Sequence, residues 1–330
     1  MYKLNNNKST KIESHTLAEL GFRESDIEEL LRNDIGIIGE DEDEESLLII
    51  GQQVKNAMHG RSDLTAIDKD GSLVLIEIKR DKKDMEARRE AFEFQAIRYA
   101  ASYATIESKE YLVKHVYAPY IEKYKNEFEL GELTPYEFGI RKINDFLKFN
   151  NALEKFNHSQ RIILVASDFD EQTLSAVAWL NKNNVDMSCF KLTPYKIGDE
   201  IFIQNEKLLP IASHKDFYVN LLTKNESIGK TNKSIVRRKL PKIDSMLEWG
   251  VVNPGDVIIA KDREDEAVLL KNGNVKVGNK EISMAIWLKN IYGWSSIQTY
   301  AFAIHKKTGK SLSQIREKYM EEKLEEQLEE

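Results

Sequence analysis

Cysteine is almost absent from this sequence, since Cys189 is the single one among 330 residues. A lone cysteine excludes an internal disulfide and a cysteine-based zinc cluster, and it suits a reducing compartment. The sequence also lacks any apolar run of the roughly 18–20 residues that a membrane span needs, and its first residues lack the apolar block of a signal peptide. These absences predict a soluble, cytoplasmic protein with no membrane partner.

An excess of positive charge is missing as well, because the formal net charge is −7. The charges are unevenly distributed, however: basic residues dominate 221–242, and acidic residues dominate 40–45 and the last ten residues. We interpret 221–242, which is also rich in Gly, Asn, Ser and Thr, as a flexible basic linker. Within it, Arg237 and Arg238 are candidates for contacts with a DNA backbone.

Length and a hydrophobic content of 41% allow two domains with real cores, which we expect over 1–220 and 243–330. Apolar periodicity and turn residues predict an α/β first domain with a mixed central sheet flanked by helices. They predict a small α+β second domain with three short strands and a helix around 282–292. In the first domain we expect, in chain order, a helix over 26–34 capped by Ser25, strands over 46–54, 63–69 and 73–80, a helix over 84–105, a mainly helical region over 107–157, a strand over 161–167, a helix over 171–184 and strands over 187–195 and 198–209.

The strand Leu73–Arg80 ends in charged residues although its first four residues are all apolar. Glu77 and Lys79 are two positions apart, so they project from the same face, and the carbonyl of Ile78 lies between them. The hairpin can bring Asp63, at the start of the paired strand, beside Glu77. Two carboxylates, a carbonyl and a lysine then converge, which suits a hard cation and phosphodiester chemistry. A structural Glu–Lys pair is the alternative, since an E-x-K pattern alone is common.

Three motifs together resemble the PD-(D/E)XK nuclease superfamily. They are Asp63, then Glu77-x-Lys79 after a hairpin, then Gln95-x-x-x-Tyr99 on the next predicted helix. The segment that contains them looks most like the branch of the NucS-type endonucleases. The likeness spans roughly residues 1–205 and implies a restriction-endonuclease-like fold.

The resemblance also implies roles for the residues that match its motifs. Asp63 and Glu77, with the carbonyl of Ile78, would hold Mg²⁺, with Mn²⁺ as an alternative. Lys79 would position or activate the attacking water and offset charge on the phosphate. Gln95 would reach the active site from its helix.

Further positions stay open at this stage. Tyr99 would pack against the site or touch DNA, and Arg80 would meet a phosphate or end the strand. The superfamily often adds a Glu from the first helix, for which Glu28 is preferred over Glu29, although a solvated helix face explains both. Ser62 stands where the family often has proline, a position that varies within the superfamily.

The second domain resembles the RAMA domain (restriction enzyme and adenine methylase associated). The likeness covers about fifty residues and rests on the Gly-x-x-x-x-Gly-Asp-Val opening at Gly250–Val257, a hairpin turn and a helix that ends near a tryptophan. Such modules are suspected of sensing DNA. Trp249, Trp287 and Trp294 could form a cage for a base, or they could form the core of the small domain.

The leading interpretation is a Mg²⁺-dependent DNA endonuclease of restriction or anti-phage defence, whose C-terminal domain recognises modified or unmodified DNA. Two alternatives are a repair nuclease for mismatched or branched DNA and a non-catalytic DNA-binding or assembly protein on a nuclease fold. Cutting both strands with one site per chain usually requires two copies, so we expect a homodimer.

Overall fold

The computed structural model describes residues 1–5, 8–38, 46–55, 60–83, 90–211 and 240–329. The chain divides into two compact units. The first comprises Met1–Ile38 and Leu48–Val236, and the second comprises Gly39–Leu47 and Arg237–Glu330. The second unit thus includes an early segment of the chain, which the expected boundaries of 1–220 and 243–330 leave in the first domain.

The first unit is built on a six-stranded sheet with the strand order β3-β4-β5-β6-β7-β8. Neighbours β4 and β5 are antiparallel, β5, β6 and β7 are parallel, and β7 and β8 are antiparallel, so the sheet is mixed as expected. Strand β5 lies inside the sheet, and all of its residues are buried. The strands are β3 (Leu47–Lys55), β4 (Arg61–Asp68), β5 (Leu73–Lys79), β6 (Gln160–Ala166), β7 (Met187–Ile197) and β8 (Glu200–Leu209).

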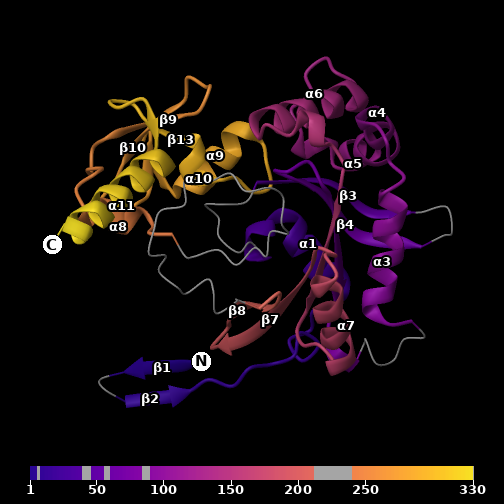
Figure 1. Cartoon of the computed structure of the whole chain (residues 1–330). Coiled ribbons are helices and arrows are strands. Elements are labelled where there is room, and N and C mark those ends of the chain that lie inside the picture. The colour runs from indigo at the N-terminus through magenta and orange to yellow at the C-terminus, as the bar shows by residue number, and fades with distance from the viewer. Residues whose placement is uncertain (6–7, 39–45, 56–59, 84–89, 212–239, 330) are drawn as a thin grey trace. The chain divides into compact units, whose positions relative to one another are not determined.

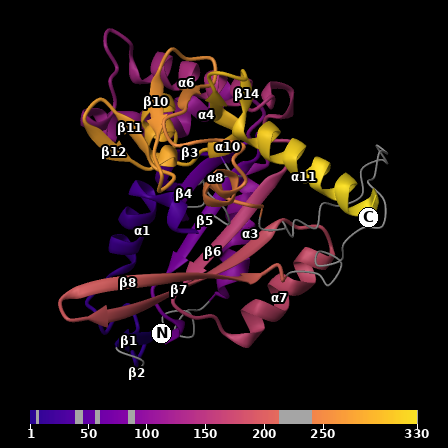
Figure 2. The same cartoon turned by 90° about the vertical axis from the view of Figure 1, so that its left-hand side faces the viewer.

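Two helices that carry candidate residues, α1 (Glu24–Asn33) and α3 (Phe92–Tyr103), lie on opposite sides of this sheet (Figures 1 and 2). Helix α1 is not capped by Ser25, so that prediction was wrong. The carboxylate of Asp26 instead accepts a hydrogen bond from the backbone N–H of Arg23 over 2.8 Å and pairs with its guanidinium. These charge-assisted bonds are stronger than the hydrogen bond that a neutral serine hydroxyl would accept as a cap. The expected helix over 84–105 is shorter in its described part, and 84–89 lie outside the described residues.

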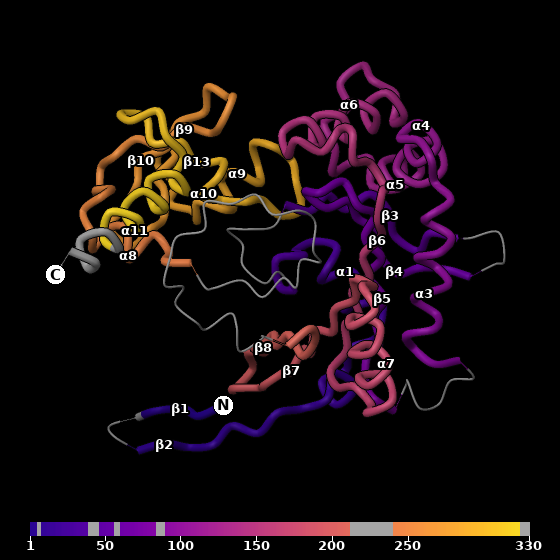
Figure 3. The backbone as a smooth tube through the Cα atoms, viewed as in Figure 1, coloured from indigo at the N-terminus to yellow at the C-terminus, as the bar shows by residue number. Residues whose placement is uncertain are grey.

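The region over 107–157 is mainly helical, as predicted, and α7 connects β6 to its parallel neighbour β7. The chain also begins with an antiparallel hairpin of β1 and β2 that the sequence pattern did not predict. Figure 3 traces the backbone through these elements. Their bounds are β1 (Tyr2–Asn5), β2 (Lys8–Lys11), η1 (Ile35–Ile38), α4 (Lys109–Leu112), η2 (Val113–Tyr117), α5 (Ala118–Lys123), η3 (Lys125–Glu127), α6 (Pro135–Phe149), η4 (Leu153–Lys155) and α7 (Glu171–Lys182).

The second unit has a six-stranded antiparallel sheet with the order β12-β11-β10-β9-β13-β14, where three strands were expected. The unexpected strands have two or three residues, too few to show an alternating pattern. No helix in the described parts of either unit is long and apolar enough to cross a bilayer. The elements are α8 (Ile243–Glu248), β9 (Val257–Ala260), β10 (Glu266–Leu269), β11 (Val275–Val277), β12 (Lys280–Ile282), α9 (Met284–Tyr292), α10 (Thr299–Phe302), β13 (Ala303–His305), β14 (Lys310–Ser311) and α11 (Leu312–Glu329).

Candidate active site

The β4–β5 hairpin brings Asp63 to the end of β5. Leu64 is paired with Ile76 in this antiparallel ladder. The preceding residue, Asp63, accepts the backbone N–H of Ile78 with its carboxylate. The turn forms because the carboxylate of Asp68 accepts the backbone N–H groups of Asp70 and Ser72.

Glu77 and Lys79 form a buried ion pair at the end of β5. Their side chains are 1% and 2% exposed, and Lys79 Nζ lies 3.3 Å from Glu77 Oε1. The same ammonium donates a hydrogen bond to the carbonyl of Ile78 over 2.8 Å. Two oxygens that the sequence assigned to a cation therefore already bind one positive charge. This pairing makes the burial of both charges tolerable in an otherwise apolar strand.

Helix α3 supplies Gln95 to this pair, as predicted. Gln95 Nε2 donates to Glu77 Oε1 over 2.6 Å, so this oxygen accepts from both an ammonium and an amide. Phe92, one turn earlier, places its ring 5.1 Å from Lys79 Nζ, within the range of a cation–π contact. The helix thus fixes the direction of both charged side chains of β5.

Asp63 is held by two hydrogen bonds at the start of β4. Its Oδ2 accepts the backbone N–H of Ile78 over 2.7 Å, and its Oδ1 accepts Gln53 Nε2 over 3.1 Å. Burial raises the pKa of Asp63, while the charge of Lys79 and the Ile78 bond act in the opposite direction. The carboxylate therefore lies in a site that favours a neighbouring positive charge.

Of the two candidate glutamates predicted on the first helix, Glu28 is the one that shares a hydrogen-bond donor with Asp63. Glu28 Oε2 accepts Gln53 Nε2 over 2.7 Å, and that nitrogen also donates to Asp63. Burial and the charge of Asp63 raise the pKa of Glu28 to about 6. Its other oxygen, Oε1, is buried and has no hydrogen-bond partner among the described residues.

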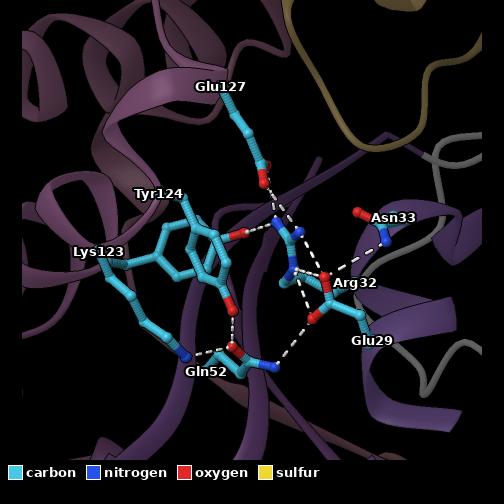
Figure 4. A network of polar contacts seen from close by, with 8 residues as sticks. Glu29, Arg32, Asn33, Gln52, Lys123, Tyr124 and Glu127 are labelled. Atoms are coloured by element: carbon cyan, nitrogen blue, oxygen red, sulfur yellow. Dashed lines mark hydrogen bonds and ion pairs between the residues drawn. The ribbon is translucent and has the colours of Figure 1, made fainter. Parts of the chain in front are cut away.

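Glu29 belongs to a different network, shown in Figure 4. The guanidinium of Arg32 donates to Glu29 Oε1 over 2.6 Å and to Glu127 Oε2 over 2.8 Å. The hydrogen bond from Arg32 lowers the pKa of Glu29. Gln52 links Glu29 to α5, because its Nε2 lies 3.4 Å from Glu29 Oε2 while its Oε1 accepts Lys123 Nζ over 2.7 Å. This network fixes α1 against the helical region, and both carboxylate oxygens of Glu29 are engaged in it.

Tyr99 packs within the first unit, the first of its two predicted roles. Its side chain is buried, and its hydroxyl accepts the backbone N–H of Arg61 over 3.1 Å. A Cβ atom on Gly60 would lie 2.5 Å from the ring of Tyr99, so glycine lets β4 begin against this ring. Arg80 is partly exposed and lies 3.4 Å from the carboxylate of Asp81.

The tryptophans of the second unit divide between core and surface. Trp287 and Trp294 are buried, and Trp294 packs edge-on against Phe302. Both rings therefore lie in the core of the second unit, which is the second of their two predicted roles. Trp249 is partly exposed and stacks on Tyr319 at 4.6 Å. The remaining candidate DNA contacts, Arg237 and Arg238, lie outside the described residues.

The oxygen atoms of Asp63, Glu77 and Ile78 are of the chemical type that a hard divalent cation prefers. Among the described residues no three side chains of His, Cys, Asp and Glu form a metal-ligand group. Mg²⁺, however, is usually bound through one or two carboxylates and keeps several waters. Asp63, Glu77 and the Ile78 carbonyl offer oxygen donors of this kind, and Glu28 Oε1 is a buried oxygen with no hydrogen-bond partner among the described residues.

The sequence analysis missed Gln53 of this site and Arg32 of the neighbouring network. Gln53 and Arg32 act through partners distant in sequence, and neither belongs to an apolar period or to a motif. Comparison of the chain with protein-family models, with curated proteins and with solved structures gave no match.

Proposed function

We propose that this chain is a Mg²⁺-dependent DNA endonuclease with a restriction-endonuclease-like first unit. The observation that supports the proposal most strongly is the buried Glu77–Lys79 pair, with Asp63 on the adjoining strand and Gln95 on α3. Burying two charges in a central strand is costly, and a functional requirement explains why they are there.

Each residue has a chemical role in phosphodiester hydrolysis. A divalent cation held by Asp63, Glu77 and the Ile78 carbonyl would polarise the scissile phosphate. Lys79 positions the attacking water or offsets the charge that develops on the phosphate oxygens. Gln95 orients Glu77 through its 2.6 Å hydrogen bond, so that the carboxylate keeps one direction.

The proposal extends to restriction or anti-phage defence, with the second unit recognising DNA, and to a homodimer that cuts both strands. Among the candidate tryptophans, Trp249 is partly exposed and is therefore the candidate for an aromatic contact with DNA. Digestion of modified and unmodified DNA of one sequence tests the recognition role, and mismatched or branched DNA tests the repair alternative. Light scattering with and without DNA tests the dimer.

A second candidate function is DNA binding without catalysis. It is favoured by one observation, that Lys79 Nζ already binds the Ile78 carbonyl and Glu77. In that case the ammonium permanently replaces the cation, and the site is a structural ion pair.

One plasmid digest separates the two candidates. Wild type, Asp63→Asn and Lys79→Met are incubated with supercoiled DNA in Mg²⁺ and in EDTA, and circular dichroism checks that each variant is folded. Matched controls are Glu132→Gln and Lys114→Met, two exposed residues of the first unit. We expect cutting by the wild type and the controls in Mg²⁺ only. Metal-dependent cutting that both site variants retain would refute the assignment, and a folded wild type that binds DNA uncut would support the second candidate.

A further inference from the structure

Gln53 joins two acids of the candidate site with a single side chain. Its Nε2 donates to Glu28 Oε2 over 2.7 Å and to Asp63 Oδ1 over 3.1 Å. Glu28 belongs to α1 and Asp63 to β4, whereas Gln53 lies on β3, so the side chain links three elements of the first unit. A primary amide nitrogen carries two N–H groups, one for each carboxylate.

The chemistry of an amide suits this position. Glu28 and Asp63 are acids in a buried environment, and each raises the free energy of charging the other. A neutral donor that bonds to both holds them close without adding a charge. It also leaves further lone pairs on both carboxylates, because each carboxylate can accept about four hydrogen bonds or metal contacts.

The backbone supplies a second, independent observation. Gln53 has a φ of 52°, in the left-handed region that residues other than glycine seldom adopt. Such conformations persist where the surroundings determine them, and they cluster at functional sites. Here the preceding residue, Gln52, bonds to Glu29, and Gln53 bonds to Glu28. Two consecutive glutamines thus bind two consecutive glutamates of α1.

We propose that Gln53 is a positioning residue of the nuclease site. Its amide fixes the direction of the Asp63 carboxylate and brings Glu28 beside it, so that both are arranged before a divalent cation binds. The inference rests on the proposed function, since it assigns Asp63 as a metal ligand. Hydrogen-bond partners of metal ligands set ligand orientation, and their loss typically lowers metal affinity by about 10–100-fold.

The first test removes the side chain without disturbing the backbone. Gln53→Gly suits the positive φ, and Asn184→Gly is a matched control at an exposed residue with a φ of 68°. Mn²⁺ binding to the full chain is measured by calorimetry without DNA, and cleavage kinetics are measured in Mg²⁺. We expect Gln53→Gly to remain folded, to bind Mn²⁺ at least about tenfold more weakly, and to lose kcat with little change in KM for DNA. The Asn184→Gly control should match the wild type in folding, in Mn²⁺ affinity and in the kinetics of cleavage.

The second test keeps the shape and removes the donors. Gln53→Glu places a third carboxylate between the two acids, so its melting temperature should lie below that of the wild type in EDTA. Mn²⁺ should narrow this difference, because a cation relieves repulsion among carboxylates. A role in packing alone predicts the same difference in both solutions.

The outcomes distinguish the two proposals. If the wild type binds Mn²⁺ and cuts DNA, and Gln53→Gly does both equally well, the role of Gln53 is refuted and the nuclease function stands. A Gln53→Gly variant that fails to fold also refutes the positioning role of Gln53, since that result assigns the residue to folding. If the wild type neither binds Mn²⁺ nor cuts DNA, the proposed function fails, and the inference fails with it.

Discussion

Replacing Lys79 with methionine tests whether the charge pair at the end of β5 is an interdependent unit. Methionine fills similar space but cannot balance the charge of Glu77, whose side chain is 1% exposed. Gln95 would remain as a neutral donor to Glu77. The variant therefore leaves a buried carboxylate without its cation, while the apolar packing around it is largely preserved.

The size of the effect follows from the burial of both partners. Breaking a buried ion pair by removing one member costs about 3–5 kcal/mol, whereas an exposed pair contributes about 0–1 kcal/mol. Lys79 and Glu77 are 2% and 1% exposed, which places them in the first class. We expect Lys79→Met to lower the free energy of unfolding by about 3–5 kcal/mol in the absence of divalent cations.

The double variant Lys79→Met/Glu77→Gln removes both charges and keeps an acceptor for Gln95. Its main loss is the hydrogen bond from the Lys79 ammonium to the Ile78 carbonyl, which is worth about 1.5–3 kcal/mol. The double variant should therefore be more stable than Lys79→Met alone, which is a coupling that independent sites do not show.

Urea unfolding of the full chain in EDTA, followed by far-ultraviolet circular dichroism, measures these differences. Lys114→Met is the control, because Lys114 is exposed on the first unit and should change stability by less than about 0.5 kcal/mol. A loss below about 1 kcal/mol for Lys79→Met, or a double variant less stable than the single one, would refute the reasoning.

Three further predictions concern individual side chains. Because the pKa of Glu28 is raised from 4.5 to about 6 in the folded state, that state binds the proton more tightly. Stability without divalent cations should therefore fall by up to about 2 kcal/mol as the pH rises through this window. Glu28→Gln should remove that fall in urea unfolding between pH 4 and pH 7.5; an unchanged fall would contradict the assignment. Gly60→Ala should cost about 1–3 kcal/mol through its clash with Tyr99, and much less in a Tyr99→Ala background; equal costs in thermal unfolding would argue against the contact. Burial raises the pKa of Cys189 to about 12, so a thiol reagent at pH 8 should label it only in denaturant, and rapid labelling of the folded protein would contradict its burial.

The sequence predicted the parts of the fold that depend on local chemistry. The turn between β4 and β5 and the apolar residues of β5 specify a central hairpin. Because side chains alternate along a strand, Glu77 and Lys79 lie on one face of β5. Helix α3 then adds Gln95 to Glu77, as expected. These features follow from spacing along the chain, so one sequence contains the information for them.

The remaining features depend on contacts between distant residues. Arg32 bonds to Glu127, which is 95 residues further along, and no periodicity predicts that partner. The role of Gln53 depends on a backbone angle that glutamine seldom adopts. The choice between Glu28 and Glu29 likewise needed the positions of Gln52 and Gln53 on a separate strand.

The early segment that belongs to the second unit restricts how this protein can be divided. The backbone N–H of Leu47 donates to Ser296 Oγ over 2.9 Å, and the backbone N–H of Gln298 donates to Ser46 Oγ over 3.1 Å. A fragment that begins at residue 240 would lose these partners, however well its own sheet folds. During synthesis, Ser46 and Leu47 leave the ribosome about 250 residues before their partners, so this part of the second unit is completed only when the chain is nearly finished.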